Sequence, residues 1–103
     1  MNKMAFLDKR NFSLKMIPDH MIEGVQLYIE RGVEPGAFLS LIIQNDFANA
    51  AAYADDENKK CLLGWCFVLH NLFPAASWGS VENMERWMRL AKDSYALKSI
   101  KNI

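Results

Sequence analysis

The sequence has few residues that could hold a small fold together through covalent or metal bonds. Only two cysteines, Cys61 and Cys66, occur among its 103 residues. At this separation within one predicted helix their side chains point in different directions, so they cannot form a disulfide. With His70 they give a C-x4-C-x3-H spacing, whereas structural zinc sites pair cysteines about two to four residues apart around a turn. We therefore expect two reduced thiols, which are typical of cytosolic proteins, and no metal.

Long apolar runs are also missing. The longest, CLLGWCFVL at 61–69, is far shorter than the roughly 20 residues that a membrane-spanning helix needs. The first residues, MNKMAFLDKRNF, contain neither the apolar segment nor the cleavage site of a signal peptide. We therefore expect a cytoplasmic protein that does not associate with a membrane.

Positive and negative charges balance over the whole chain, since the formal net charge at pH 7 is +0. The distribution is nevertheless uneven. Residues 1–15 carry a balance of +3 and residues 86–103 a balance of +4, while residues 16–85 carry −7. Such an asymmetry bears on partners and solubility rather than on the fold.

Residues that break helices are scarce, with five glycines and three prolines, while 51% of the residues are apolar. This composition is sufficient for one core and excludes a disordered chain. We predict an all-α fold, a compact bundle of four to five short helices around a central apolar helix at about 57–73. The predicted organisation is a flexible basic N-terminal arm at 1–16, a single helical domain at 17–95 and a flexible basic C-terminal tail at 96–103.

The first predicted helix runs from about Pro18 to Arg31, because proline suits the first turn and Gly32 can cap the last one. Its apolar residues recur at helical spacing and predict one buried face. That face contains Ile17, Met21, Ile22, Val25, Tyr28 and Ile29. A polar strip on the opposite side, here named the acidic ridge, contains Asp19, Glu23, Gln26 and Glu30, with Glu34 just beyond the helix.

Residues 35–54 form either one helix or two. We favour two that meet at Asn45-Asp46, because both side chains compete well for backbone amides. The predicted central helix is apolar around almost its whole circumference, which is typical of a buried helix. Its apolar residues are Leu62, Leu63, Trp65, Cys66, Phe67, Val68, Leu69, Leu72 and Phe73. Gly64 costs about 1 kcal/mol relative to alanine in a helix interior, so we expect a neighbouring helix to approach it closely.

The last predicted helix begins after Ser80, which is well placed to cap it. Trp78 precedes this cap, where an apolar residue can pack back on the first turn. Two readings of Trp78 follow, a packing residue that closes the fold or an exposed recognition residue, and we favour the first.

Candidate catalytic residues are few. Cys66 and His70 have the spacing of a nucleophilic pair, and Asp46 is another candidate partner for His70, but no oxyanion loop accompanies them. The run Asp55-Asp56-Glu57 lacks the alternating ligands and glycine of a calcium loop and is typical of a helix start. Neither a glycine-rich phosphate loop nor a GxSxG motif occurs. We therefore predict a protein that is not an enzyme and needs no cofactor.

Two segments, PGAFLSLIIQNDFANAAAYADDEN at 35–58 and NLFPAASWGSVENMERWM at 71–88, together resemble a family of small phage and prophage proteins. The resemblance covers about residues 17–90, with Ala37 in place of a usual serine. It implies a phage or prophage product in a bacterial cytoplasm and brings no established activity or catalytic residue. The residues that carry it are Tyr28, Glu30, Gly32, Pro35, Gly36, Phe38, Leu39, Asn45, Asp46, Ala54, Asp55, Asn58, Pro74, Trp78, Gly79 and Ser80.

We predict that the protein acts by contact with a host or phage protein, one form of which is inhibition of a host or defence complex. The acidic ridge is the predicted contact surface, because it could engage a basic groove. The alternative is nucleic-acid association through the basic termini. Its predicted contacts are Lys3, Lys9, Arg10, Lys98 and Lys101. Homodimerisation is compatible with either prediction.

Overall fold

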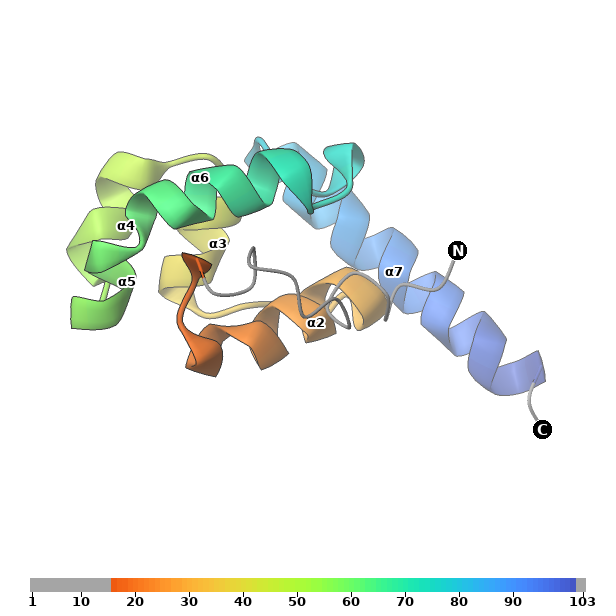
Figure 1. Cartoon of the computed structure of the whole chain (residues 1–103). Coiled ribbons are helices and arrows are strands. Elements are labelled where there is room, and N and C mark those ends of the chain that lie inside the picture. Colours follow the sequence, from red (N-terminus) through yellow and green to blue (C-terminus); the bar gives the residue numbers. More distant parts are fainter. Residues whose placement is uncertain (1–15, 102–103) are drawn as a thin grey trace.

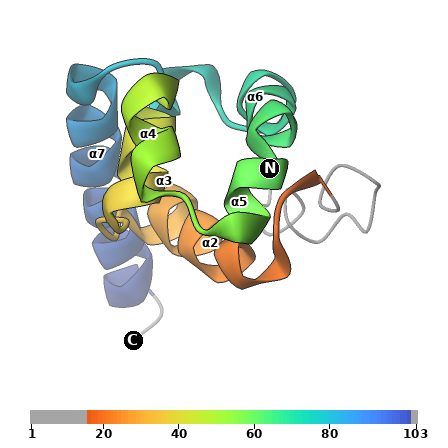
Figure 2. The same cartoon turned by 90° about the vertical axis from the view of Figure 1, so that its left-hand side faces the viewer.

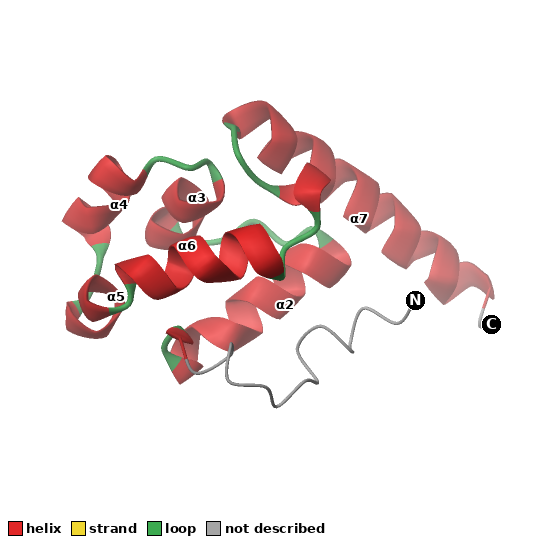
Figure 3. Cartoon of the chain, turned by 45° about the horizontal axis from the view of Figure 1, so that its top comes forward, coloured by secondary structure: helices red, strands yellow, loops and turns green. Residues whose placement is uncertain are grey.

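The computed structural model describes residues 16–101, with side chains up to Lys98. This part of the chain contains six α-helices, two short 3-10 turns and no strand, which confirms the all-α fold (Figures 1 and 3). The elements are η2 (Asp19–Met21), α2 (Ile22–Arg31), α3 (Ala37–Ile43), α4 (Phe47–Tyr53), α5 (Asp56–Lys60), α6 (Leu62–Asn71), η3 (Ala75–Ser77) and α7 (Val81–Lys101). The predicted arm at 1–16 lies almost wholly outside the described residues.

Helix α2 ends at Gly32, which has φ 71° and caps the helix as predicted. This glycine also lies directly on α7, because a Cβ atom there would overlap the carbonyl group of Met88. The indole of Trp87 on α7 donates a hydrogen bond to the carbonyl oxygen of Ile29 at 3.2 Å. Close backbone contact therefore joins α2 and α7, and it requires glycine at position 32.

Two helices occupy residues 37–53, as we favoured. Helix α3 ends before Asn45, which takes φ 65°, a left-handed conformation that asparagine tolerates better than most residues. Asp46 then caps α4 by accepting from the backbone N–H of Asn49 at 3.3 Å. Asn45 thus ends α3 and Asp46 caps α4, as their side chains predict.

The predicted central helix at 57–73 is wrong as a single element. It is divided at Cys61 into α5 and α6, where the backbone N–H of Cys61 bonds to the carbonyl of Asn58 in a tightened last turn. Helix α6 is also not buried on all sides, because Leu63 is 85% exposed. Figure 2 shows α5 and α6 on one side of the molecule, opposite α7, with α2 and α3 between them.

The core lies where α2, α3 and α6 meet. Trp65 is fully buried, and Phe38 contacts its ring edge-on with the ring centroids 5.9 Å apart. Gly64 allows close approach as predicted, although the neighbour is the backbone of Met16 and not a helix. The largest fully buried side chains are Trp65, Tyr28, Ile42, Ile43, Leu69, Val25, Val68 and Ser77.

Helix α7 begins after Ser80, whose hydroxyl accepts from the backbone N–H of Asn83 at 3.0 Å and confirms the predicted cap. Trp78 is half-buried against the core and lies edge-on to His70, with ring centroids 4.8 Å apart. This placement supports the packing reading.

The C-terminal tail that we expected from residue 96 is helical as far as Lys101. Residues 81–101 contain neither glycine nor proline, and Ala96, Leu97 and Lys98 favour helix, so nothing ends α7 earlier. The C-terminal end of α7 projects beyond the other helices (Figure 1). Among the described residues no helix combines the length and apolar character needed to cross a membrane.

Candidate functional site

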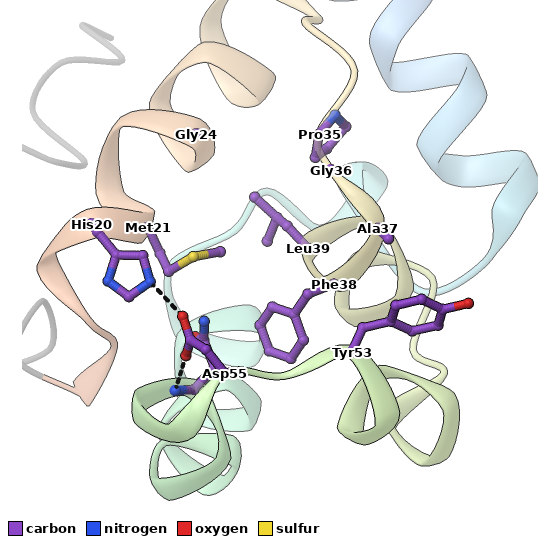
Figure 4. A pocket seen from close by; sticks show the side chains of 11 residues that line it. His20, Met21, Gly24, Pro35, Gly36, Ala37, Phe38, Leu39, Tyr53 and Asp55 are labelled. Carbon is purple, nitrogen blue, oxygen red and sulfur yellow. Dashed lines mark hydrogen bonds and ion pairs between the residues drawn. The ribbon is translucent and has the colours of Figure 1, made fainter.

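An open hollow of about 400 Å³ lies between the start of α2, the start of α3 and the chain from Tyr53 to Asn58 (Figure 4). It draws on three segments that are distant in the sequence. The lining residues are His20, Met21, Gly24, Pro35, Gly36, Ala37, Phe38, Leu39, Tyr53, Asp55 and Asn58.

The lining of the hollow combines an apolar floor with a polar rim. Met21, Phe38 and Leu39 supply the floor, and Phe38 is held in place by its contact with Trp65. Tyr53, at the rim, is 63% exposed. The backbone at Gly36 faces open space, since nothing lies within 4 Å of the position of a Cβ atom there. The hollow therefore offers apolar surface and an exposed aromatic ring to a molecule from outside.

Asp55 supplies a carboxylate at the rim. It caps α5, and its Oδ1 accepts from the backbone N–H of Asn58 at 2.8 Å. This hydrogen bond is the main cause that lowers the pKa of the Asp55 carboxyl, and the hydrogen bond and charge of His20 add to it, against a smaller opposing effect of desolvation. Asp55 is therefore ionised at neutral pH, and its side chain remains 54% exposed.

His20 lies between two carboxylates. Its Nε2 is 2.9 Å from Oδ2 of Asp55, and its Nδ1 is 3.2 Å from Oε1 of Glu57. A carboxylate only accepts, so the ring donates to both oxygens when both of its nitrogens carry protons. A second open hollow, of about 380 Å³, is lined by Ile17, Pro18, Asp19, Glu57, Lys60 and Cys61.

A chain of hydrogen bonds fixes Asp55 to the core. The indole Nε1 of Trp65 donates to Oδ1 of the buried Asn58 at 2.9 Å, and the backbone N–H of Asn58 donates to Asp55. The rim carboxylate is thus held by the backbone of a buried residue of α5, whose side chain is bonded to Trp65 of α6.

The acidic ridge lies on a different flank of α2 from the hollow. The residues of α2 and η2 that line the hollow are His20, Met21 and Gly24, while at 100° per residue the ridge turns away from them. Within the ridge, Gln26 donates to Glu30 at 3.4 Å, and both are half-buried. The exposed members of the ridge are Asp19, Glu23 and Glu34. Only Asp19 approaches the hollows, as part of the lining of the second one.

The residues predicted for nucleic-acid contact are only partly described. Lys3, Lys9 and Arg10 lie outside the described residues, as does the side chain of Lys101. Lys98 is exposed on α7. The structure therefore brings together no complete set of the predicted basic contacts.

The candidate catalytic residues do not form a reactive pair in the described part of the chain. Nδ1 of His70 lies 3.1 Å from the carbonyl oxygen of Cys66, so the ring bonds to the main chain and not to the thiol. His70 is therefore an exposed residue with a local hydrogen bond to the main chain. Asp46 caps α4 instead of orienting His70. No group of three or more metal-ligating residues comes together within the described residues.

Sequence reasoning identified the helix-start role of Asp55 but missed its contact with His20. His20 and Asp55 are separated by 35 positions, and no periodic pattern joins them. The one available signal was the segment 35–58, whose Pro35, Gly36, Phe38 and Leu39 line the hollow together with Asp55 and Asn58.

Neither a family model, a curated protein nor a solved structure matches this chain. The resemblance to phage and prophage proteins therefore stays a prediction.

Proposed function

We propose that this chain is a non-enzymatic protein-binding domain whose main contact surface is the hollow lined by Phe38, Tyr53 and Asp55. The observation that carries the proposal is the combination of an apolar floor with an ionised carboxylate at an open rim. Protein-binding surfaces commonly combine a buried apolar or aromatic centre with a polar rim. The acidic ridge, which we first expected to be the contact surface, becomes a flanking surface in this proposal.

The partner that we propose is a protein of a phage or of its bacterial host, met in the cytoplasm. Support comes from the pattern that resembles phage and prophage proteins, because six of its residues line the hollow. These residues are Pro35, Gly36, Phe38, Leu39, Asp55 and Asn58. Inhibition of a host or defence complex is the concrete form of this proposal, since a domain that acts by contact alone can block a surface.

A variant that fills the hollow tests the proposal. Gly36 has φ −71° and open space at its Cβ position, so Gly36→Trp can place a large ring over the floor without strain in the backbone. Gly36→Ala is the matched control, because it changes the same position and leaves the hollow open. Tagged protein is used to capture partners from nuclease-treated bacterial lysate, which are then quantified by mass spectrometry.

The proposal predicts a stoichiometric protein partner that survives nuclease, is retained by Gly36→Ala and is lost with Gly36→Trp. Equal capture by both variants would move the contact surface elsewhere. The double variant Glu23→Lys/Glu30→Lys then tests the acidic ridge, which lies on another flank of α2.

The alternative function is nucleic-acid association through the basic ends. One observation favours it, since Arg86, Arg89 and Lys92 are exposed along α7 together with Lys98. Loss of all captured partners on nuclease treatment, with binding that weakens steeply as salt rises, would support this alternative.

A further inference from the structure

We infer that the hollow takes the side chain of a lysine or arginine from the partner, with its charged end at Asp55. This inference rests on the proposed function and names the chemistry of the partner. It goes beyond a general contact surface because it commits to one kind of side chain in one place.

The charges around the hollow favour a cation. Asp55 is the one carboxylate among the described residues that line it, and none of those residues is a lysine or arginine. Asp56 and Glu57, both exposed, follow Asp55 directly in the chain and add negative charge nearby. The imidazole ring of His20 already lies against this negative charge, with its nitrogens facing Asp55 and Glu57. A ligand with an anionic end would be repelled.

The apolar floor suits the stem of the same side chain. Lysine and arginine bury their methylene groups along apolar surface while the charged end stays near water. Met21, Phe38 and Leu39 provide such a surface beside Asp55. Stem and charge of one side chain are therefore matched at the same time.

His20 and the incoming cation would share one oxygen. Oδ1 of Asp55 is held by the backbone N–H of Asn58, whereas Oδ2 faces His20 at 2.9 Å. The cation therefore displaces or shares the His20 bond at Oδ2, while Nδ1 of His20 can stay with Glu57. His20→Gln, which removes the ring that occupies Oδ2 of Asp55, should strengthen binding of the cation.

The test is an NMR titration of the full ¹⁵N-labelled chain with three blocked tripeptides. The probes are acetyl-Gly-Lys-Gly-amide, acetyl-Gly-Arg-Gly-amide and acetyl-Gly-norleucine-Gly-amide, the last of which keeps the aliphatic stem and lacks the charge. We expect the lysine and arginine probes to shift the backbone amides of Gly36, Tyr53 and Asn58, and the norleucine probe to bind about fivefold more weakly or worse. Added salt should weaken the charged probes and leave the norleucine probe unchanged.

Two variants separate Asp55 from general acidity. Asp55→Asn keeps a good capping residue for α5 and removes the charge, so the fold should persist while binding of the lysine probe falls about fivefold. Asp56→Asn removes the same charge one residue away, outside the lining, and should weaken binding of the probe much less than Asp55→Asn does. The NMR spectrum itself reports whether each variant is folded.

Equal binding of the norleucine and lysine probes would overturn the inference and leave the proposed function standing as an apolar contact. Equal losses in Asp55→Asn and Asp56→Asn, or no shifts with the lysine probe at any concentration reached, would also overturn it. The proposed function fails in a different experiment, when lysate yields no nuclease-resistant partner that is sensitive to Gly36→Trp.

Discussion

The indole nitrogen of Trp65 donates a hydrogen bond to Oδ1 of Asn58 at 2.9 Å, although a break in the helix lies between the two residues. Both residues are buried, and the backbone N–H of Asn58 holds the carboxylate of Asp55 at the surface. This relationship connects the core of the domain to the rim of the hollow. The predictions below test the core, the close backbone approaches and the surface in turn.

Removal of the Asn58 side chain should destabilise the domain without removing the cap of α5. Asn58→Ala leaves the indole N–H of Trp65 buried without its acceptor, which costs about 1–3 kcal/mol. The bond from the Asn58 backbone to Asp55 does not depend on the side chain. Chemical denaturation measures the loss, and Asn49→Ala on the exposed start of α4 is the matched control. Equal stabilities of the two variants would contradict the role of Asn58.

Alanine should destabilise the domain at two of the glycines and be tolerated at a third. Gly32→Ala meets a left-handed backbone, which costs about 1–2 kcal/mol, and also meets the carbonyl of Met88. Gly64→Ala must displace the backbone of Met16, for which overpacking typically costs about 1–3 kcal/mol. Gly36→Ala meets open space, so it should leave the free energy of unfolding nearly unchanged. Thermal melts compare the three variants. A destabilised Gly36→Ala would contradict the open space at the start of α3.

Two neighbouring positions of α6 should differ sharply. Trp65→Ala removes a fully buried ring and should cost about 3–5 kcal/mol, a large share of the total stability of a small domain. Leu63→Ala, at a residue that is 85% exposed, should cost less than about 0.5 kcal/mol. The measurement is urea denaturation followed by circular dichroism. A large loss with Leu63→Ala would instead restore the picture of a helix that is buried on all sides.

Tyr28 should make the domain sensitive to alkaline pH. Its buried hydroxyl donates to the carbonyl oxygen of Ser77 at 2.6 Å, and burial raises the pKa of the Tyr28 phenol well above its ordinary value. The unfolded chain therefore loses this proton first, and stability falls as pH rises above about 10, by about 1.4 kcal/mol per pH unit for one proton.

The Tyr28→Phe variant isolates this effect from the titration of lysines. It should be about 1–2 kcal/mol less stable than the parent at neutral pH, because the hydrogen bond to Ser77 is lost. Its disadvantage should shrink as pH rises above about 10. Urea denaturation of both proteins at neutral and alkaline pH gives the difference. A constant difference at all pH values would contradict the burial of the phenol.

Much of the fold could be predicted because local chemistry decides it. Gly32, Asp46 and Ser80 cap helices in the structure as their positions in the sequence indicated. The break at Cys61 was not predicted, because neither proline nor glycine marks that position in the sequence. The length of α7 was underestimated because a basic, polar end was interpreted as a tail.

The hollow was beyond sequence reasoning for a similar reason. The pairing of His20 with Asp55 joins segments that no periodicity connects, and it appears once α2 and α5 are placed together. The acidic ridge was visible as a helical stripe, but a stripe of charge is also what any solvated helix presents. The hollow differs from the ridge in its concave shape, and that shape cannot be read from the sequence.

Site-specific photocrosslinking in bacteria tests the central claim most directly, which is that the hollow is the contact surface for a protein. The photoreactive residue p-benzoyl-phenylalanine replaces Tyr53 at the rim or, as the matched control, Tyr95 on α7, which does not line the hollow and whose ring lies under Arg31. The account predicts a discrete crosslinked protein from position 53 that is absent from position 95. Crosslinks from position 95 alone would contradict it and place the contact on α7.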